Sequence, residues 1–136
     1  MHVKSVSGFM RSAVVAGLLA APVAASADSA EGVWQTEPMG KGGYAHIQIA
    51  PCSGKTDRLC GKITKIISSD RTDLVGVELL RDMTAKGSDR WGDGDIFSPD
   101  KQQYFASHMI LESNDRLEVR GCIAALCKSQ KWARVD

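Results

Sequence analysis

The sequence has few of the residues on which chemistry usually depends. It contains only 3 histidines and 6% aromatic residues, and its 17 basic side chains nearly balance its 16 acidic ones, for a formal charge of +1. Nucleic-acid-binding domains usually carry a clustered basic surface, so this balance argues against a nucleic-acid partner. A length of 136 residues with 43% apolar residues fits one small globular domain rather than two domains or a disordered chain.

Motifs for catalysis and for nucleotide or calcium binding are also scarce. No Gly-x-Ser-x-Gly nucleophile elbow occurs. Gly54-Lys55-Thr56 copies the end of a phosphate-binding loop, but Ile49 stands where that motif requires glycine, so we predict a hairpin turn. Residues 91–95 lack the remaining ligands of a calcium loop and predict a bulge or turn. We therefore predict a protein that is not an enzyme and has no cofactor and no metal.

The first 27 residues have the pattern of a secretory signal peptide. Two basic residues and no acidic ones precede an apolar run over residues 12–21, and the small residues Ala25-Ser26-Ala27 follow. The run is too short for a membrane span, which needs about 20 residues. A buried N-terminal helix is the alternative. We predict cleavage after Ala27, which changes the formal charge from +1 to −1 and leaves residues 28–136 as a single periplasmic or secreted domain without a lipid anchor.

Four cysteines remain in the mature chain, and in a small exported domain an even count usually means disulfides. Cys52 and Cys60 flank a polar turn, while Cys122 and Cys127 flank residues 123–126. Three pairings are possible. We favour Cys52–Cys60 with Cys122–Cys127, because each pair brackets a predicted hairpin turn. A zinc site is the alternative, although the spacing is irregular for one.

Short apolar segments separated by turn-forming residues predict an all-β domain. Residues 116–120 alternate most clearly, with Leu117 and Val119 on one face and three charged residues on the other. Residues 74–80 are ambiguous and also fit a short helix. The predicted strands are residues 32–37, 44–51, 59–67, 74–81, 91–97, 103–112, 116–122 and 129–135.

Eight short strands suit either a sandwich or a barrel. We favour a small eight-stranded antiparallel β-barrel, because closure removes the exposed strand edges that a secreted monomer must protect. Such a small core gains stability from two disulfides. We expect a monomer, with a dimer as the alternative.

Several short runs occur together in a recognisable order. They are Gly32-x-Trp34, Ile49-Ala50-Pro51-Cys52, Leu59-Cys60-Gly61-Lys62-Ile63, Trp91-Gly92 with Ile96-Phe97-x-Pro99, Tyr104, Leu117-x-Val119-Arg120-Gly121-Cys122 and Ser129-Gln130-x-Trp132-x-Arg134-Val135. From about Gly32 to Val135, the ordered set resembles the DUF2147 family of bacterial exported domains of unknown function. The family often carries a longer insert where this chain has only residues 68–73. The resemblance implies a β-rich periplasmic domain and supplies no catalytic residues.

A Gly-x-Trp motif on the first predicted strand and an arginine near the end of the last one, Trp34 and Arg134, form a second pattern. It resembles, more loosely, the calycin barrels of the lipocalin group, in which the arginine packs over the tryptophan and closes one end. A guanidinium on an indole face contributes about 0.5–2 kcal/mol. Two unrelated residues at strand ends are the alternative. On this resemblance we predict a calycin-like barrel in which Trp34, Arg134 and Trp132 have structural roles.

Strand 103–112 is mostly apolar on both faces, which is unusual for a strand with water on one side. Burial under a loop or an oligomer contact explains this, and so does a barrel interior that holds a ligand. An eight-stranded barrel just fits its own side chains or one small ligand, and we favour a filled core. One face carries Phe105, Ser107, Met109 and Leu111. The other face supplies our candidate ligand-binding residues, Tyr104, Ala106, His108 and Ile110.

We therefore hypothesise a non-enzymatic binding module whose barrel mouth takes a small apolar or amphipathic molecule. His46 and His108 sit mid-strand among apolar residues, which favours surface or hydrogen-bonded histidines over catalytic bases. The alternative is a protein-binding envelope factor, such as an inhibitor of a secreted hydrolase or a cell-envelope maintenance protein. That factor would act through residues 38–43, 84–95 and 123–127. An enzyme is the third hypothesis.

Overall fold

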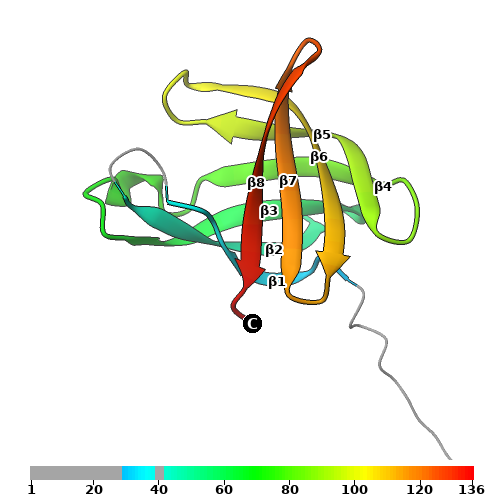
Figure 1. Ribbon diagram of the computed structural model, residues 1–136, viewed down its shortest axis with the longest axis horizontal. Helices are drawn as coiled ribbons and strands as arrows, with labels where there is room; N and C mark the ends of the chain where they lie inside the picture. Colours follow the sequence, from blue (N-terminus) through cyan, green and yellow to red (C-terminus); the bar gives the residue numbers. More distant parts are fainter. Residues whose placement is uncertain (1–28, 39–41) are drawn as a thin grey trace, which may run out of the picture.

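The structure, a computed structural model, describes residues 29–38 and 42–136. The predicted signal peptide therefore lies outside the described residues. Eight antiparallel strands in chain order form a closed barrel (Figure 1), which confirms the predicted fold. The strands are β1 (Gly32–Gln35), β2 (Tyr44–Cys52), β3 (Lys55–Ile67), β4 (Glu78–Ala85), β5 (Arg90–Ser98), β6 (Gln103–Ser113), β7 (Arg116–Ile123) and β8 (Leu126–Arg134).

The up-and-down topology gives the barrel two different ends. The connections after β2, β4 and β6 lie at one end, together with residues 29–31 and the C-terminus, and we call this the closed end. The connections after β1, β3, β5 and β7 lie at the other, which we call the loop end. The barrel closes where β1 pairs with β8, through Trp34 opposite Arg134 and Gln35 opposite Ala133. Within the described residues, no helix has the length and apolar character needed to cross a membrane.

The middle of the barrel is filled by its own side chains. Alternate residues of each strand point inward, as expected for a small barrel. A side chain with almost no exposed surface leaves no space beside it for a ligand. The large inward side chains with 0–1% exposure are Trp34, Ile47, Ile49, Leu80, Met83, Met109 and Leu117.

The region predicted as a strand over residues 74–81 is arranged differently. Residues Thr72–Leu74 form a 3-10 turn, η2, and Gly76 follows with φ of 95°. β4 therefore begins only at Glu78 and continues to Ala85, four residues past the predicted end. The alternative of a short helix over residues 74–80 was wrong, because the helical turn ends at Leu74 and residues 78–80 belong to β4.

The segment resembling a calcium loop is a β-bulge, as predicted. The register of β5 against β6 shifts between Trp91 and Gly94, and Asp93 between them has φ of 57°. A Cβ atom at Gly94 would lie 2.6 Å from the carbonyl oxygen of Arg81 on β4. Glycine at this position therefore allows the bulged strand to pass close to its neighbour.

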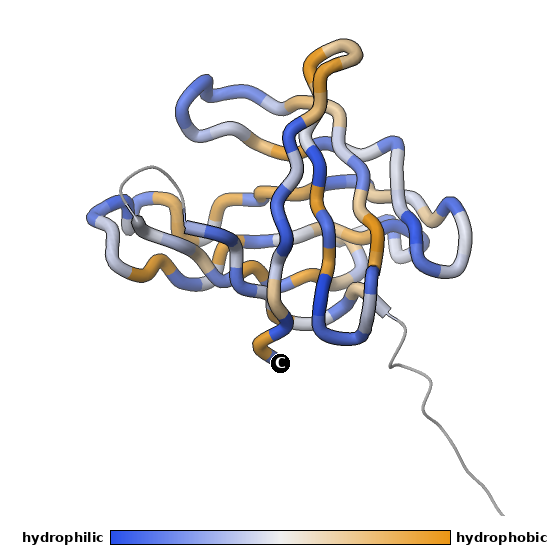
Figure 2. The backbone as a smooth tube through the Cα atoms, in the orientation of Figure 1, coloured by the Kyte–Doolittle hydropathy of each residue, from blue (hydrophilic) through white to orange (hydrophobic). Residues whose placement is uncertain are grey.

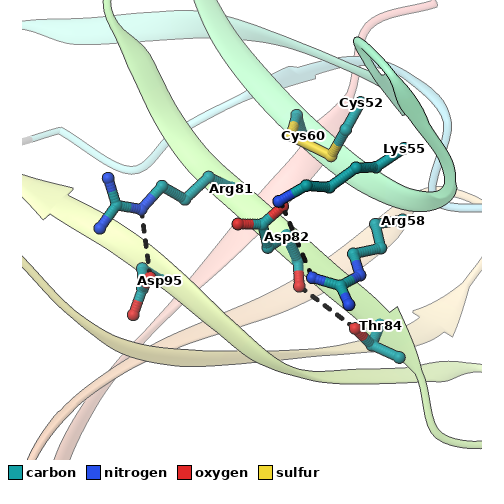
Figure 3. Close-up of a disulfide and its surroundings, with 8 residues drawn as sticks. All are labelled: Cys52, Lys55, Arg58, Cys60, Arg81, Asp82, Thr84 and Asp95. Carbon is teal, nitrogen blue, oxygen red and sulfur yellow. Dashed lines mark hydrogen bonds and ion pairs between the residues drawn. A yellow bond between two sulfur atoms is a disulfide. The ribbon is translucent and has the colours of Figure 1, made fainter.

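Both predicted disulfides are present, and each staples a hairpin. Cys52–Cys60 joins β2 to β3 with the Cα atoms 4.9 Å apart, and it lies beside an ion pair of Lys55 with Asp82 (Figure 3). Cys122 and Cys127 stand directly opposite each other on β7 and β8. The residues between the first pair include Gly54, whose φ of 77° makes the hairpin turn that was predicted there.

Candidate functional site

The four candidate ligand-binding residues lie on the outer face of β6. Ala106 and His108 are exposed, while Tyr104 and Ile110 are half-buried. The inward face instead carries Ser107, Met109 and Leu111, with exposures of 1%, 0% and 7%. The four candidates therefore do not line the barrel interior. Alternation alone could not separate the two faces, because both are mostly apolar.

Tyr104 is already engaged by the outer surface of the barrel. The guanidinium carbon of Arg81 lies 3.5 Å from the centre of the Tyr104 ring, and the phenol hydroxyl donates to the carbonyl of Glu78 at 2.8 Å. Arg81 Nε in turn donates to Asp95 at 3.1 Å (Figure 3). These contacts hold β4, β5 and β6 together on the outside, so Tyr104 has a structural partner at every polar atom of its side chain.

His108 and Ile110 do share a concave site. The outer wall of the barrel has a hollow of about 300 Å³, which we call the outer hollow. This is at the lower end of the size range of small-molecule sites. Its lining is Lys86, Arg90, Trp91, Gly92, Asp93, His108, Ile110 and Arg120.

The outer hollow combines an apolar part with a basic part. Ile110 supplies an apolar side chain, Trp91 lines the hollow but belongs to the buried core, and the lining holds three basic residues against one acidic residue. Lys86 pairs with Asp93, and this hydrogen bond lowers the pKa of the Asp93 carboxyl. Arg90 forms no ion pair with any described residue. The arrangement suits a small molecule that has both an apolar body and a negative charge.

Arg120 is positioned by an almost buried carboxylate. Its guanidinium Nη2 lies 3.0 Å from Glu118, which is 8% exposed and also lies 3.7 Å from Lys131 Nζ. A carboxylate this buried is stable only when it is paired. Glu118 therefore fixes the orientation of Arg120 at the edge of the outer hollow, a role that the alternating pattern of β7 did not reveal.

His108 also approaches the second disulfide. Its Nε2 lies 3.4 Å from Cys122 Sγ, and with Cys127 the three residues form a close group. Cys52, Cys60 and Asp82 form a similar group around the other disulfide. Sulfur atoms bonded to each other offer no thiolate to a metal, so in this state neither group is a metal site. His46 lies elsewhere, 3.1 Å from the side-chain oxygen of Gln35.

The closed end is sealed by Trp34 and Arg134, the two residues that the resemblance to calycin barrels places together. The guanidinium carbon of Arg134 lies 4.3 Å from the ring centre of Trp34, whose indole nitrogen donates to Ala30 at 2.8 Å. Arg134 also donates to the carbonyls of Ser29 and Glu31, at 2.7 and 2.8 Å. These bonds fold residues 29–31 across the end of the barrel. Trp132, with 2% exposure, packs in the core above them.

A closed eight-stranded barrel sealed in this way has a lipocalin-like fold. The protein HP1028 from Helicobacter pylori, described as belonging to the lipocalin family, is similar in structure with a TM-score of 0.64. The similarity covers 79% of this chain and 84% of that one at 13% sequence identity, and so concerns the fold. The chain itself belongs to the DUF2147 family, described as uncharacterized protein conserved in bacteria, which it matches over residues 32–134. A comparison with curated proteins found no match.

The two disulfides indicate the cellular compartment in which the protein works. Disulfides persist in oxidising environments and are rare in the bacterial cytoplasm. A bacterial domain that carries both Cys52–Cys60 and Cys122–Cys127 is therefore indicated to work outside the cytoplasm.

Proposed function

We propose that this protein is a non-enzymatic binding module for a small amphipathic anion, exported to the periplasm by cleavage after Ala27. The observation that carries the proposal is the outer hollow, with the apolar side chain of Ile110 beside a surplus of basic ones. The filled middle of the barrel supports this position over the interior, because Met109 and Leu117 leave no space beside them. The proposed site thus moves from the barrel mouth to the outer wall.

The anionic preference follows from the state of the three basic residues. Lys86 and Arg120 are each paired with an acidic side chain, whereas Arg90 is exposed and forms no ion pair within the described part of the chain. A ligand carboxylate or phosphate would accept charge-assisted hydrogen bonds from Arg90, while Ile110 contacts its apolar part. A cationic amphiphile of the same length would lack that partner.

The test is calorimetric titration of the mature protein with laurate, with dodecyltrimethylammonium as the cationic control of equal chain length. We expect laurate to bind and the cation not to bind. Arg90→Ala should weaken laurate binding about tenfold or more, since a hydrogen bond to a charged group contributes about 1.5–3 kcal/mol. Lys65→Ala, an exposed base on β3, a strand that contributes no residue to the hollow, is the matched control. Equal binding of both amphiphiles, or laurate binding unaffected by Arg90→Ala, contradicts the proposal.

The alternative of a protein-binding envelope factor has narrower support. Of its three predicted segments, residues 84–95 are largely strand, and residues 39–41 lie outside the described part of the chain. Among the described residues of the three segments, only 123–127 include large apolar side chains that are exposed. That surface is a separate feature from the outer hollow.

A further inference from the structure

The end of the β7–β8 hairpin is the most exposed apolar surface of the described residues. It consists of Ile123, Ala124, Ala125 and Leu126, which we call the apolar tip. Leu126 is 81% exposed and Ile123 is 54% exposed. The hairpin projects beyond the neighbouring strands at the loop end, and its tip is apolar (Figures 1 and 2). The other large exposed apolar residues, Val75 and Val135, are each 48% exposed and lie apart from it.

The apolar tip is held in shape by the disulfide beneath it. Ile123 and Leu126 are paired across the hairpin, and the next pair is Cys122 with Cys127. Hairpin turns of two residues usually contain asparagine and glycine, because one or both need positive φ. Here an alanine has the positive φ instead, because the φ of Ala124 is 55°. The turn therefore presents no polar side chain, and the disulfide keeps both strands together despite the unfavourable turn sequence.

The part of this hairpin nearest the tip, residues 119–130, carries basic but no acidic side chains, and we call it the hairpin arm. Between Val119 and Gln130 the chain has two basic side chains, Arg120 and Lys128, and no acidic one, and Arg120 is paired with Glu118. Lys128 lies nearest to the apolar tip, is exposed, and forms no ion pair with a described residue. Arg120 lies one residue pair further along, opposite Ser129, so Lys128 and Arg120 point to opposite faces of the arm.

We propose that the apolar tip docks the protein on an anionic phospholipid bilayer, with Lys128 and Arg120 at the level of the headgroups. Two residues of strand, about 7 Å, separate Leu126 from Lys128. Elements that lie in the membrane interface enter it by about 5–10 Å, so the spacing places the apolar side chains below the headgroups and the bases among them.

The charge pattern favours a bilayer over the other occupants. A second copy of this chain or a hydrophobic pocket of another protein would cover Ile123 and Leu126 but would leave Lys128, which has no ion pair with a described residue, without a partner. An anionic membrane offers an apolar layer directly beneath a negative one, which matches both features of the arm. The proposal shares Arg120 with the outer hollow, but it rests on the apolar tip and Lys128, which do not line that hollow.

The experiment is co-sedimentation of the mature protein with vesicles of phosphatidylglycerol and phosphatidylcholine, compared with phosphatidylcholine alone. We expect binding to the anionic vesicles only. Ile123→Ser with Leu126→Ser should lower the partition coefficient at least about tenfold, because it removes most of the insertable apolar surface. Lys128→Gln should lower it about fivefold, the effect of one base near such a surface. Val75→Ser with Val135→Ser is the matched control and should bind as the wild type does.

The outcomes separate this proposal from its competitors and from the proposed function. Near-UV circular dichroism checks that each variant keeps the fold. Wild-type binding by the tip variant, or equal binding to both kinds of vesicle, overturns the proposal. So does sedimentation velocity showing a dimer that the tip substitutions dissociate, or a purified envelope protein that binds the tip while vesicles do not. Arg90→Ala should leave vesicle binding unchanged, so the two sites fail or succeed separately.

Discussion

At the scale of single residues, Gly94 shows how tightly the outer strands are packed. A Cβ atom there would lie 2.6 Å from Arg81 O and 3.0 Å from Met83 Cα, both of which are backbone atoms that move little. We expect Gly94→Ala to lower the free energy of unfolding by about 1–3 kcal/mol, as overpacking usually does. Urea denaturation followed by tryptophan fluorescence measures this change.

Gly92, two residues earlier on the same bulge, provides the control. A Cβ atom there would meet only the side chain of Lys86, at 3.5 Å, which is ordinary contact. Gly92→Ala should therefore change the stability by no more than about 0.5 kcal/mol. If the two alanine variants were equally stable, the bulge would not bring β5 as close to β4 as described.

The residues that could be predicted from the sequence are those whose roles depend on local chemistry. Trp34 and Arg134 were predicted as a stacked pair because their motif resembles that of calycin barrels, and residues 91–95 were predicted as a bulge or turn because the remaining ligands of a calcium loop are missing. The orientation of Tyr104 and His108 was not predictable. Both faces of β6 are mostly apolar, and which face turns inward depends on the register with β5 and β7.

At the scale of elements, the two disulfides close loops of similar size. The sequence separations are 8 for Cys52–Cys60 and 5 for Cys122–Cys127, for which chain entropy gives about 2–3 kcal/mol each. We expect each double serine variant to stay folded with a loss of stability of that order. Denaturation in urea of the two variants, in parallel with the wild type, tests this prediction.

The two hairpins should nevertheless differ in function. Cys122→Ser with Cys127→Ser frees the apolar tip to fray, because Ala124 then holds its positive φ without support. Vesicle binding should fall several-fold in this variant and stay unchanged in the Cys52→Ser, Cys60→Ser variant, although both are destabilised alike. Equal loss of vesicle binding in the two variants would mean that global stability, rather than the stapled tip, controls docking.

Strand positions were predictable where turn residues bracket an alternating segment, and β7 is an example. The position of β4 was not. The apolar run from Leu74 to Leu80 reads as one strand, but hydrogen bonds from Leu74 N to Arg71 O and from Val75 N to Thr72 O wind its start into a turn. Ile63 N then donates to Val77 O, so the neighbouring strand decides where pairing begins. Such contacts across long separations leave no local signal in the chain.

At the scale of the whole molecule, the barrel has three regions with different features. The closed end is sealed by Arg134 and residues 29–31, the outer wall carries the hollow, and the loop end carries the apolar tip. The filled interior gives these regions a rigid frame, since its large side chains have almost no exposed surface. Both proposed binding surfaces therefore lie outside the barrel, where changing them should leave the core intact.

The seal at the closed end also bears on where the mature protein should begin. Ala30 has 0% exposure, and the carbonyls of Ser29 and Glu31 accept hydrogen bonds from Arg134, so the barrel uses the chain from residue 29 onward. Cleavage after Ala27 would leave one residue, Asp28, before this segment. We expect the intact mass of protein recovered by osmotic shock to correspond to residues 28–136 with both disulfides formed.

Deletion variants test the same N-terminal boundary through its effect on the stability of the folded protein. Removing residue 28 from the mature chain should leave the urea midpoint unchanged. Removing residues 28–31 should lower the free energy of unfolding by about 2 kcal/mol or more, because Arg134 loses hydrogen bonds to two carbonyls and Trp34 loses its cover. A mature protein that begins after Ala30, or deletion variants of equal stability, would show that the segment does not seal the barrel. Unprocessed protein with free thiols would contradict export.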